Sequence, residues 1–202
     1  ELDRALKLGP DNLLVQAIVA VYWRRVGNPE RALSYLYRAA EIEPENAFWQ
    51  AEIGETLAQM ADLDRALEHF QRAVDMEPGH LQYWVRLAQF SVHYEVSLRA
   101  TGLPAIRRAL SMDPASAQIL DLYGNALFKL ADPVGAERFL QRSLERDPSN
   151  PEAHLHLAQL FLENGENARA AAHLQRATEL AGPDDTAGAL ARRLLVRYFG
   201  GG

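Results

Sequence analysis

The stretch that decides the fold is residues 47–80, AFWQAEIGETLAQMADLDRALEHFQRAVDMEPGH, because its pattern recurs along the chain. A proline stands near its end, and equivalent prolines recur at spacings of 34, 34, 36, 34 and 35 residues. These prolines are Pro10, Pro44, Pro78, Pro114, Pro148 and Pro183. An internal period of this length predicts an array of repeated structural units.

Further columns of residues follow the same period. A small residue lies five residues before each of the first five prolines: Ala5, Ala39, Ala73, Ala109 and Ser143. Ala177 continues this column in the last repeat. Upstream runs a large apolar column, made of Leu36, Phe70, Ile106, Leu140 and Leu174. A second small column precedes it, made of Ala32, Ala66, Gly102, Ala136 and Ala170. In the first half of each unit, a large apolar residue is followed by a small one. These pairs are Val19–Ala20, Ile53–Gly54, Leu87–Ala88, Tyr123–Gly124 and Leu157–Ala158.

This combination of columns resembles the tetratricopeptide repeat family over nearly the whole chain. The family's unit is a pair of antiparallel helices, A and B, that ends near a proline. The tryptophan column of the family is kept only at Trp84, and Gln16, Gln50, Leu120 and His154 stand in its place elsewhere. The resemblance implies an all-α fold, an α-solenoid of tandem helix hairpins stacked as a right-handed superhelix, because one hairpin cannot bury its apolar stripe alone.

The period divides the chain into units of a single solenoid spanning residues 1–202. Residues 1–12 are interpreted as the end of a truncated repeat, so we expect a further repeat upstream. Five repeats and a C-terminal capping helix follow, at 13–46, 47–80, 81–116, 117–150, 151–183 and 184–199. In the capping helix, one face is expected to be apolar and buried, formed by Ala187, Leu190, Ala191, Leu194, Leu195 and Tyr198.

Helix ends are predicted from turn chemistry. Each proline follows a helix B, which it stops because it lacks an N–H. Polar residues placed to cap the next helix A are Asn12, Asn46, Ser116 and Asn150, and Pro151 suits a first helical position.

The stretch SVHYEVSLRATG at residues 91–102 lies within the third repeat and carries two extra residues between its helices. Either helix A runs on to near Leu98 or the turn loosens, with Thr101 capping helix B and Pro104 in its first turn. A tolerated loop insertion is the main interpretation. The alternative is a local feature that widens the groove near His93 or offers Tyr94 at its rim.

Composition narrows the classes of function. The net charge of −6 over 202 residues argues against a nucleic-acid partner. Cysteine is absent, which excludes disulfides and thiol chemistry from this stretch. No apolar run is long enough for membrane insertion. The cytoplasm is the default compartment for such a sequence, and a leader upstream of Glu1 would change that assignment.

Few residues are spaced for metal binding or catalysis. His154 and His156 lie about 200° apart on one helix, so they do not converge on an ion, and no metal or other cofactor is expected. Glu52 and Glu55 share a face but have no pocket that would separate their pKa values for acid–base catalysis. We therefore predict that the chain is not an enzyme.

Arginine forms a column of its own, at Arg4, Arg38, Arg72, Arg108, Arg142 and Arg176. Four of these have an acid three residues on, at Glu41, Asp75, Glu145 and Glu179. Pairs of this spacing favour a solvated helix face over a ladder of anion sites.

The face of the A helices turned away from the B helices is expected to line a concave groove. The resemblance implies that this groove binds a peptide or protein partner. Its expected binding residues are Glu52, Glu55, Arg86, Gln89, His93, Asp121, Asn125, Lys129, His156 and Gln159. A carboxylate clamp of the kind that holds chaperone C-termini is disfavoured, because Glu52, Glu55 and Asp121 would repel an acidic tail.

Two alternatives stay open. In the first repeat the groove face is apolar, formed by Leu14, Ala17, Ile18 and Val21. Upstream repeats would cover this face, or it would pair with another copy as part of a homo-oligomer assembled through the solenoid ends. The other alternative is a regulatory or substrate-recruiting arm of a larger enzyme, such as a glycosyltransferase.

Overall fold

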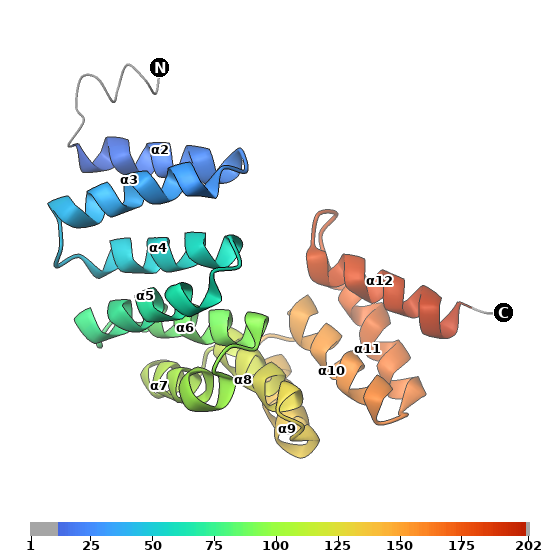
Figure 1. Cartoon of the computed structure of the whole chain (residues 1–202). Coiled ribbons are helices and arrows are strands. Elements are labelled where there is room, and N and C mark those ends of the chain that lie inside the picture. The colour runs from blue at the N-terminus through green and yellow to red at the C-terminus, as the bar shows by residue number, and fades with distance from the viewer. Residues whose placement is uncertain (1–11, 201–202) are drawn as a thin grey trace. The chain divides into compact units, whose positions relative to one another are not determined.

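The periodic columns fold into successive helices joined by short turns (Figure 1). The computed structural model describes residues 12–200, and within that range no β-strand is present. The chain divides into two units between Val96 and Ser97, inside the repeat expected at 81–116. The prediction of one solenoid over residues 1–202 therefore stays a prediction, and each unit is described by itself.

The first unit is built from helix hairpins. Its helices are α2 (Leu13–Arg25), α3 (Pro29–Ile42), α4 (Ala47–Gln59), α5 (Leu63–Met76) and α6 (Leu81–Tyr94). Helices α2 and α3 pack together, as do α4 and α5, and each B helix also contacts the A helix that follows it. In Figure 1 these helices lie side by side, from blue at α2 to green at α6.

The second unit repeats this arrangement. A π-helical turn (Leu98–Gly102) opens it. Six α-helices follow: α7 (Leu103–Met112), α8 (Ala117–Lys129), α9 (Pro133–Arg146), α10 (Pro151–Glu163), α11 (Asn167–Leu180) and α12 (Thr186–Phe199). Helices α8 and α9 form one hairpin, α10 and α11 form another, and α12 packs on both helices of the latter.

The predicted columns form the core of both units. The large apolar column, from Leu36 to Leu174, is at most 3% exposed at every position. In the first small column, the members from Ala39 to Ala177 are at most 1% exposed, and Ser143 donates its hydroxyl to the carbonyl of Ala117 at 2.8 Å. Ala5 belongs to the same column but lies outside the described residues. The all-α fold of tandem helix hairpins is confirmed.

Close helix approach explains the glycines of the large-then-small pairs. A Cβ added to Gly124 would lie 2.5 Å from Cγ of Leu140, which leaves no room for it. At Gly54 the corresponding Cβ would lie 3.2 Å from the ring of Phe70. The requirement for a residue without a side chain is therefore stricter in the fourth repeat than in the second.

The predicted caps are present. Side-chain oxygens of Asn12, Asn46, Ser116 and Asn150 accept hydrogen bonds from backbone N–H groups in the first turns of α2, α4, α8 and α10. Pro151 is the first residue of α10. Each cap satisfies a donor that the helix itself leaves unpaired.

The inserted stretch decides between the two alternatives for this turn and departs from one expectation. Helix α6 ends at Tyr94 and does not extend to Leu98. Glu95 and Ser97 both adopt left-handed conformations, with φ of 57° and 49°. Thr101 does not cap helix B: it lies inside the π-turn, where its N–H donates to the carbonyl of Ser97 at 2.7 Å. The prediction of a loosened turn is correct, because the extra residues are absorbed here and Pro104 falls in the first turn of α7.

Helix α12 covers the end of the last hairpin. Ala187 and Ala191 are buried against Leu155, Ala158, Leu174 and Ala177, and Leu190, Leu194 and Leu195 pack against the same cluster. Tyr198 was expected on this buried face, but it is 52% exposed because the last turn of α12 extends past the cluster. No helix within residues 12–200 is both long and apolar enough to cross a membrane.

Candidate functional site

In the first unit, the A-helix face brings together two arginines and two glutamates from three helices. Arg24 on α2 donates to one carboxylate oxygen of Glu52 at 2.9 Å, and Arg86 on α6 pairs with the other oxygen at 2.9 Å. The Arg86 guanidinium also lies 3.8 Å from Glu55. Glu52 is thus held between two cations, with only 13% of its side chain exposed.

Three of these residues were predicted from the sequence, and Arg24 was missed. The apolar stripe of α2 runs through Leu14, Ala17 and Val21, and continuing it by one more helical step reaches Arg24. The predicted repulsion of acidic ligands also changes. Glu52 is neutralised by its two partners, whereas the side chain of Glu55 remains 44% exposed.

A small recess, about 20 Å³ in volume, adjoins this ion group between α2 and α4. Its walls include Ala17, Val21 and Phe48, and Arg24 and Glu52 form its polar side. The apolar face predicted on the first repeat is exposed in part: Leu14 is 68% exposed, Ile18 51% and Val21 42%. The face therefore offers an apolar recess beside fixed charges.

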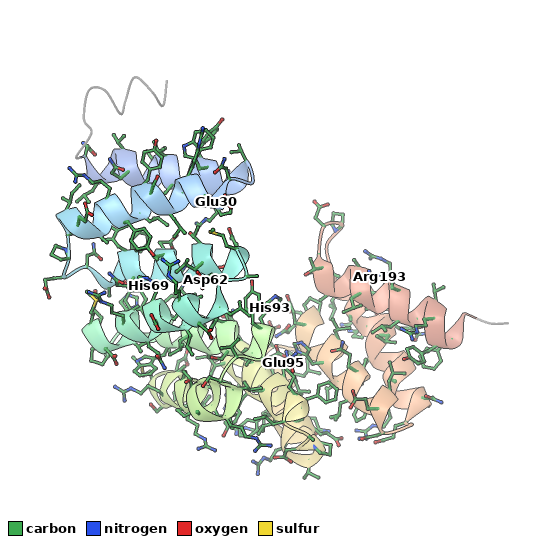
Figure 2. All side chains as sticks on the ribbon, viewed as in Figure 1. Glu30, Asp62, His69, His93, Glu95 and Arg193 are labelled. Atoms are coloured by element: carbon green, nitrogen blue, oxygen red, sulfur yellow. The ribbon has the colours of Figure 1, made fainter. Side chains whose placement is uncertain are left out.

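Gln89 and His93 continue the same face along α6, beyond Arg86. Gln89 is half-buried, and His93 is exposed with its ring edge against Tyr94, at 4.6 Å between ring centroids. His93 and Glu95 lie at the C-terminal end of α6 (Figure 2).

In the second unit, His156 on α10 lies between two polar residues of α8. Its Nδ1 lies 2.8 Å from a carboxylate oxygen of Asp121, and its Nε2 lies 3.1 Å from the amide nitrogen of Asn125. Asp121 was expected on the groove face as a charge that repels an acidic tail, but it is only 8% exposed and lies against the imidazole of His156. Gln159, one turn beyond His156, is half-buried, and Lys129 is exposed at the end of α8.

His154 lies on another side of α10 and faces α11. Its Nδ1 lies 2.9 Å from Nδ1 of His173, so one ring donates and the other accepts. Burial lowers the pKa of His154. Burial, together with the charges of His154 and Arg169, lowers the pKa of His173 to about 4. Residues 12–200 contain no cluster of three or more His, Cys, Asp or Glu placed to hold a metal ion.

The arginine column pairs only in part as predicted. Arg38 and Glu41 form an ion pair at 3.2 Å, and Arg176 and Glu179 form one at 3.1 Å. Arg142 instead lies over the ring of Phe139, at 5.3 Å. Arg72 has neither a hydrogen-bond nor an ion-pair partner in the part of the chain that the structure describes. Arg4 lies outside the described residues.

Known family models match the repeated helix hairpins. Models of the tetratricopeptide repeat match residues 52–93, 87–151 and 127–194, which together span more than half of the 202 residues. The chain belongs to the tetratricopeptide repeat family. Tetratricopeptide repeat proteins are generally non-enzymatic scaffolds. No curated protein is a significant match to the sequence.

Solved tetratricopeptide repeat structures share the fold at low sequence identity. TTC0263 from Thermus thermophilus is 22% identical, with a TM-score of 0.72, over 92% of this chain and all (100%) of that one. MamA from Desulfovibrio magneticus RS-1 is 23% identical, with a TM-score of 0.67, over 83% of this chain and 94% of that one. YrrB, described as a tetratricopeptide repeat protein with an unusual peptide-binding site, is 18% identical, with a TM-score of 0.62, over 95% and 97% of the two chains. At these identities the likeness shows the fold alone.

Proposed function

We propose that the chain is a scaffold that binds a peptide or protein segment along the groove face of its A helices. The observation that carries this proposal is the hollow between α2 and α4 beside the Arg24–Glu52–Arg86 ion group. An apolar side chain of the partner can cover the partly exposed apolar walls of this recess, and the fixed charges beside it set the orientation of the segment. The peptide-binding site named for YrrB agrees with this class of function.

The residues of the first unit suggest what the segment contains. Val21 and Phe48 line the recess and are about 40% exposed, at 42% and 41%, so an apolar side chain inserted there removes both from water. Glu52 is already saturated by two arginines. Glu55 is the more exposed carboxylate, with only a 3.8 Å contact to Arg86. We therefore expect a partner that places an apolar residue in the recess and a lysine or arginine near Glu55.

In the second unit, the A helices α8 and α10 carry hydrogen-bonding groups of their own. The Asp121–His156–Asn125 group is held by its own hydrogen bonds, and Gln159 and Lys129 lie beside it on α10 and α8. Amide and ammonium groups of this kind bind the backbone of an extended or helical peptide.

The test is selection of peptides from a random displayed library, followed by calorimetric titration against variants. Ala17→Trp fills the recess and should abolish binding of selected peptides. Combined replacement of Gln89, Asn125 and Gln159 by alanine should weaken it. Val134→Ser is the control, because Val134 is 79% exposed at the start of α9 and lies outside the recess. Unchanged affinity in both groove variants would refute the proposal.

A second candidate function is self-association through the first repeat. Tyr22 is 43% exposed, whereas the residues at the same repeat position, Thr56, Phe90, Ala126 and Leu160, are at most 4% exposed. Helix α2 therefore presents surface that the other A helices bury. Light scattering over a range of concentrations should show oligomers that Leu14→Glu with Ile18→Glu dissociates, and a monomer at all concentrations would exclude this function.

A further inference from the structure

A second hollow lies where α3, α4 and α5 meet, and its volume is about 270 Å³. Gln50 of α4 lines it, whereas Glu52, two residues on, belongs to the ion group of the groove. Two residues correspond to about 200° around a helix, so this hollow and the groove lie on opposite sides of α4. The proposed function above does not use it.

A chain of hydrogen bonds leads to this hollow. Arg65 donates to the hydroxyl oxygen of Tyr37 at 2.8 Å, the Tyr37 hydroxyl lies 3.5 Å from Nε2 of His69, and Nδ1 of His69 lies 2.9 Å from Oε1 of Gln50. Figure 2 shows His69 on α5, in the same helix that Asp62 precedes. Asp62 in turn accepts a hydrogen bond from Arg65 at 3.0 Å.

The direction of this chain is fixed at its start. A guanidinium only donates, so the Tyr37 oxygen accepts and its hydrogen points to Nε2 of His69. The proton of His69 is then on Nδ1, where it is donated to Oε1 of Gln50. Burial lowers the pKa of His69, and the charges of Arg72 and Arg65 lower it further, so the ring is neutral at pH 7. Gln50 therefore turns its amide nitrogen, a donor, away from His69.

Two donors at this hollow have no partner. Gln50 is only 4% exposed, and among the described residues its amide nitrogen meets no acceptor. Arg72 lines the same hollow and lacks an ion-pair partner, unlike Arg38 and Arg176 at the same repeat position. An amide donor on a buried side chain, held in one orientation and lining the same hollow as the exposed guanidinium of Arg72, matches the chemistry of a carboxylate.

The remaining walls define what adjoins that carboxylate. Ala40, Pro44 and Ile53 give an apolar surface beside the two donors. Glu41 also lines the hollow, and Arg38 holds its carboxylate at 3.2 Å. The negative charge of Glu41 disfavours a ligand with a second carboxylate close to the first.

We propose that this hollow is a second binding site, which takes a peptide carboxylate carried next to an apolar residue. The Gln50 amide donates a hydrogen bond to the carboxylate, Arg72 neutralises its charge, and Ala40 and Pro44 contact the apolar side chain. The fifth repeat shows the contrast: His154 and His173 occupy the positions of Gln50 and His69, but they bond to each other through their Nδ1 atoms and present no equivalent amide donor.

The test uses the peptide acetyl-Ala-Leu as its free acid and as its C-terminal amide. In two-dimensional ¹H–¹⁵N spectra of the full chain, the free acid should shift the two side-chain amide signals of Gln50, and the amide form should not. Arg72→Gln should lower the affinity for the free acid roughly tenfold, or about 1.4 kcal/mol, because it removes the charge that neutralises the carboxylate. Gln50→Leu should remove binding, and leucine is tolerated because Leu120 fills the same repeat position at 0% exposure.

Arg176→Gln is the matched control, because Arg176 has the same repeat position but already pairs with Glu179. A third peptide, amidated at its C-terminus and carrying glutamate as its last residue, separates the sources of the carboxylate: its binding identifies a side-chain carboxylate, and its failure identifies a chain terminus. Equal shifts from the free acid and its amide, absence of shifts, or an equal loss in Arg72→Gln and Arg176→Gln would each overturn the proposal. Its failure would leave the groove proposal intact, because the two sites lie on opposite sides of α4.

Discussion

Both ring nitrogens of His156 are engaged from α8, with Nδ1 2.8 Å from the carboxylate of Asp121. A half-buried imidazole thus ties the A helices of two successive repeats together, since Asp121 belongs to the fourth repeat and His156 to the fifth. Asp121 is 8% exposed, so its partner replaces most of the water it would otherwise bind.

Removal of this partner should be costly. We expect His156→Leu to lower the free energy of unfolding by about 1–3 kcal/mol, because it leaves a buried carboxylate without its donor. Urea denaturation of His156→Leu, Asp121→Asn and the double variant gives the coupling between the two side chains. Additive effects of the two substitutions would show that the contact contributes nothing.

Glu52 should matter more than the surface ion pairs. Glu52→Gln leaves Arg24 and Arg86 facing each other with one neutral acceptor, and all three side chains are at most 22% exposed. We expect a loss of roughly 1.5–3 kcal/mol in the free energy of unfolding. Arg38→Gln is the control, because its pair with Glu41 is 51% and 68% exposed and such pairs contribute about 0–1 kcal/mol. Equal losses in both variants would contradict this ranking.

Stability should fall in mild acid because of His173. Its pKa is lowered from 6.5 in the unfolded chain to about 4 in the folded one, mainly by burial, then by His154 and Arg169, with Glu137 opposing. Between these values the unfolded chain binds more protons, so the free energy of unfolding decreases as the pH falls from 6.5 towards 4. Urea midpoints measured across this window should fall less steeply in His173→Gln. The same slope in the variant would show that other groups cause the loss.

The fourth repeat should reject a methyl group that the second tolerates. Gly124→Ala places a Cβ 2.5 Å from Leu140, whereas Gly54→Ala places one 3.2 Å from the ring of Phe70. Overpacking lowers the free energy of unfolding by about 1–3 kcal/mol, and the higher helix propensity of alanine offsets up to about 1 kcal/mol of that loss. We expect a clear loss of melting temperature for Gly124→Ala and little change for Gly54→Ala. An equal response of both variants would indicate that the helices separate easily.

The fold could be predicted because its period comes from packing. Leu140 and Ala136 are required wherever two helices touch at this distance, and their columns are visible in a single sequence. The backbone conformation of the turns could be predicted less well from the sequence. Gly27, Ala61, Ala131 and Gly165 occupy one repeat position, and all four have positive φ between 58° and 77°. Alanine has no turn preference, so two of these four positions gave no indication of their conformation.

The candidate site was predicted as a face but not as a set of contacts. Helical spacing correctly placed Glu52 and Arg86 on the A-helix face, but it does not show which opposite charges meet across helices. Asp121 was expected to repel an acidic tail, but its carboxylate pairs with His156, which is 35 residues away in sequence. Such pairings follow from how successive repeats stack, which periodicity fixes only approximately.

The turn at Glu95 and Ser97 suggests a use for the scaffold as a carrier of foreign sequence. Two extra residues are accommodated there between a helix that ends at Tyr94 and a helix that begins at Leu103. Glu95 and Ser97 are exposed, and their left-handed backbone is one that glycine adopts at lower cost. A short glycine-flanked epitope grafted between them should therefore be displayed to an antibody without a lower melting temperature, whereas the same graft at Gly54, in the middle of α4, should unfold the hairpin.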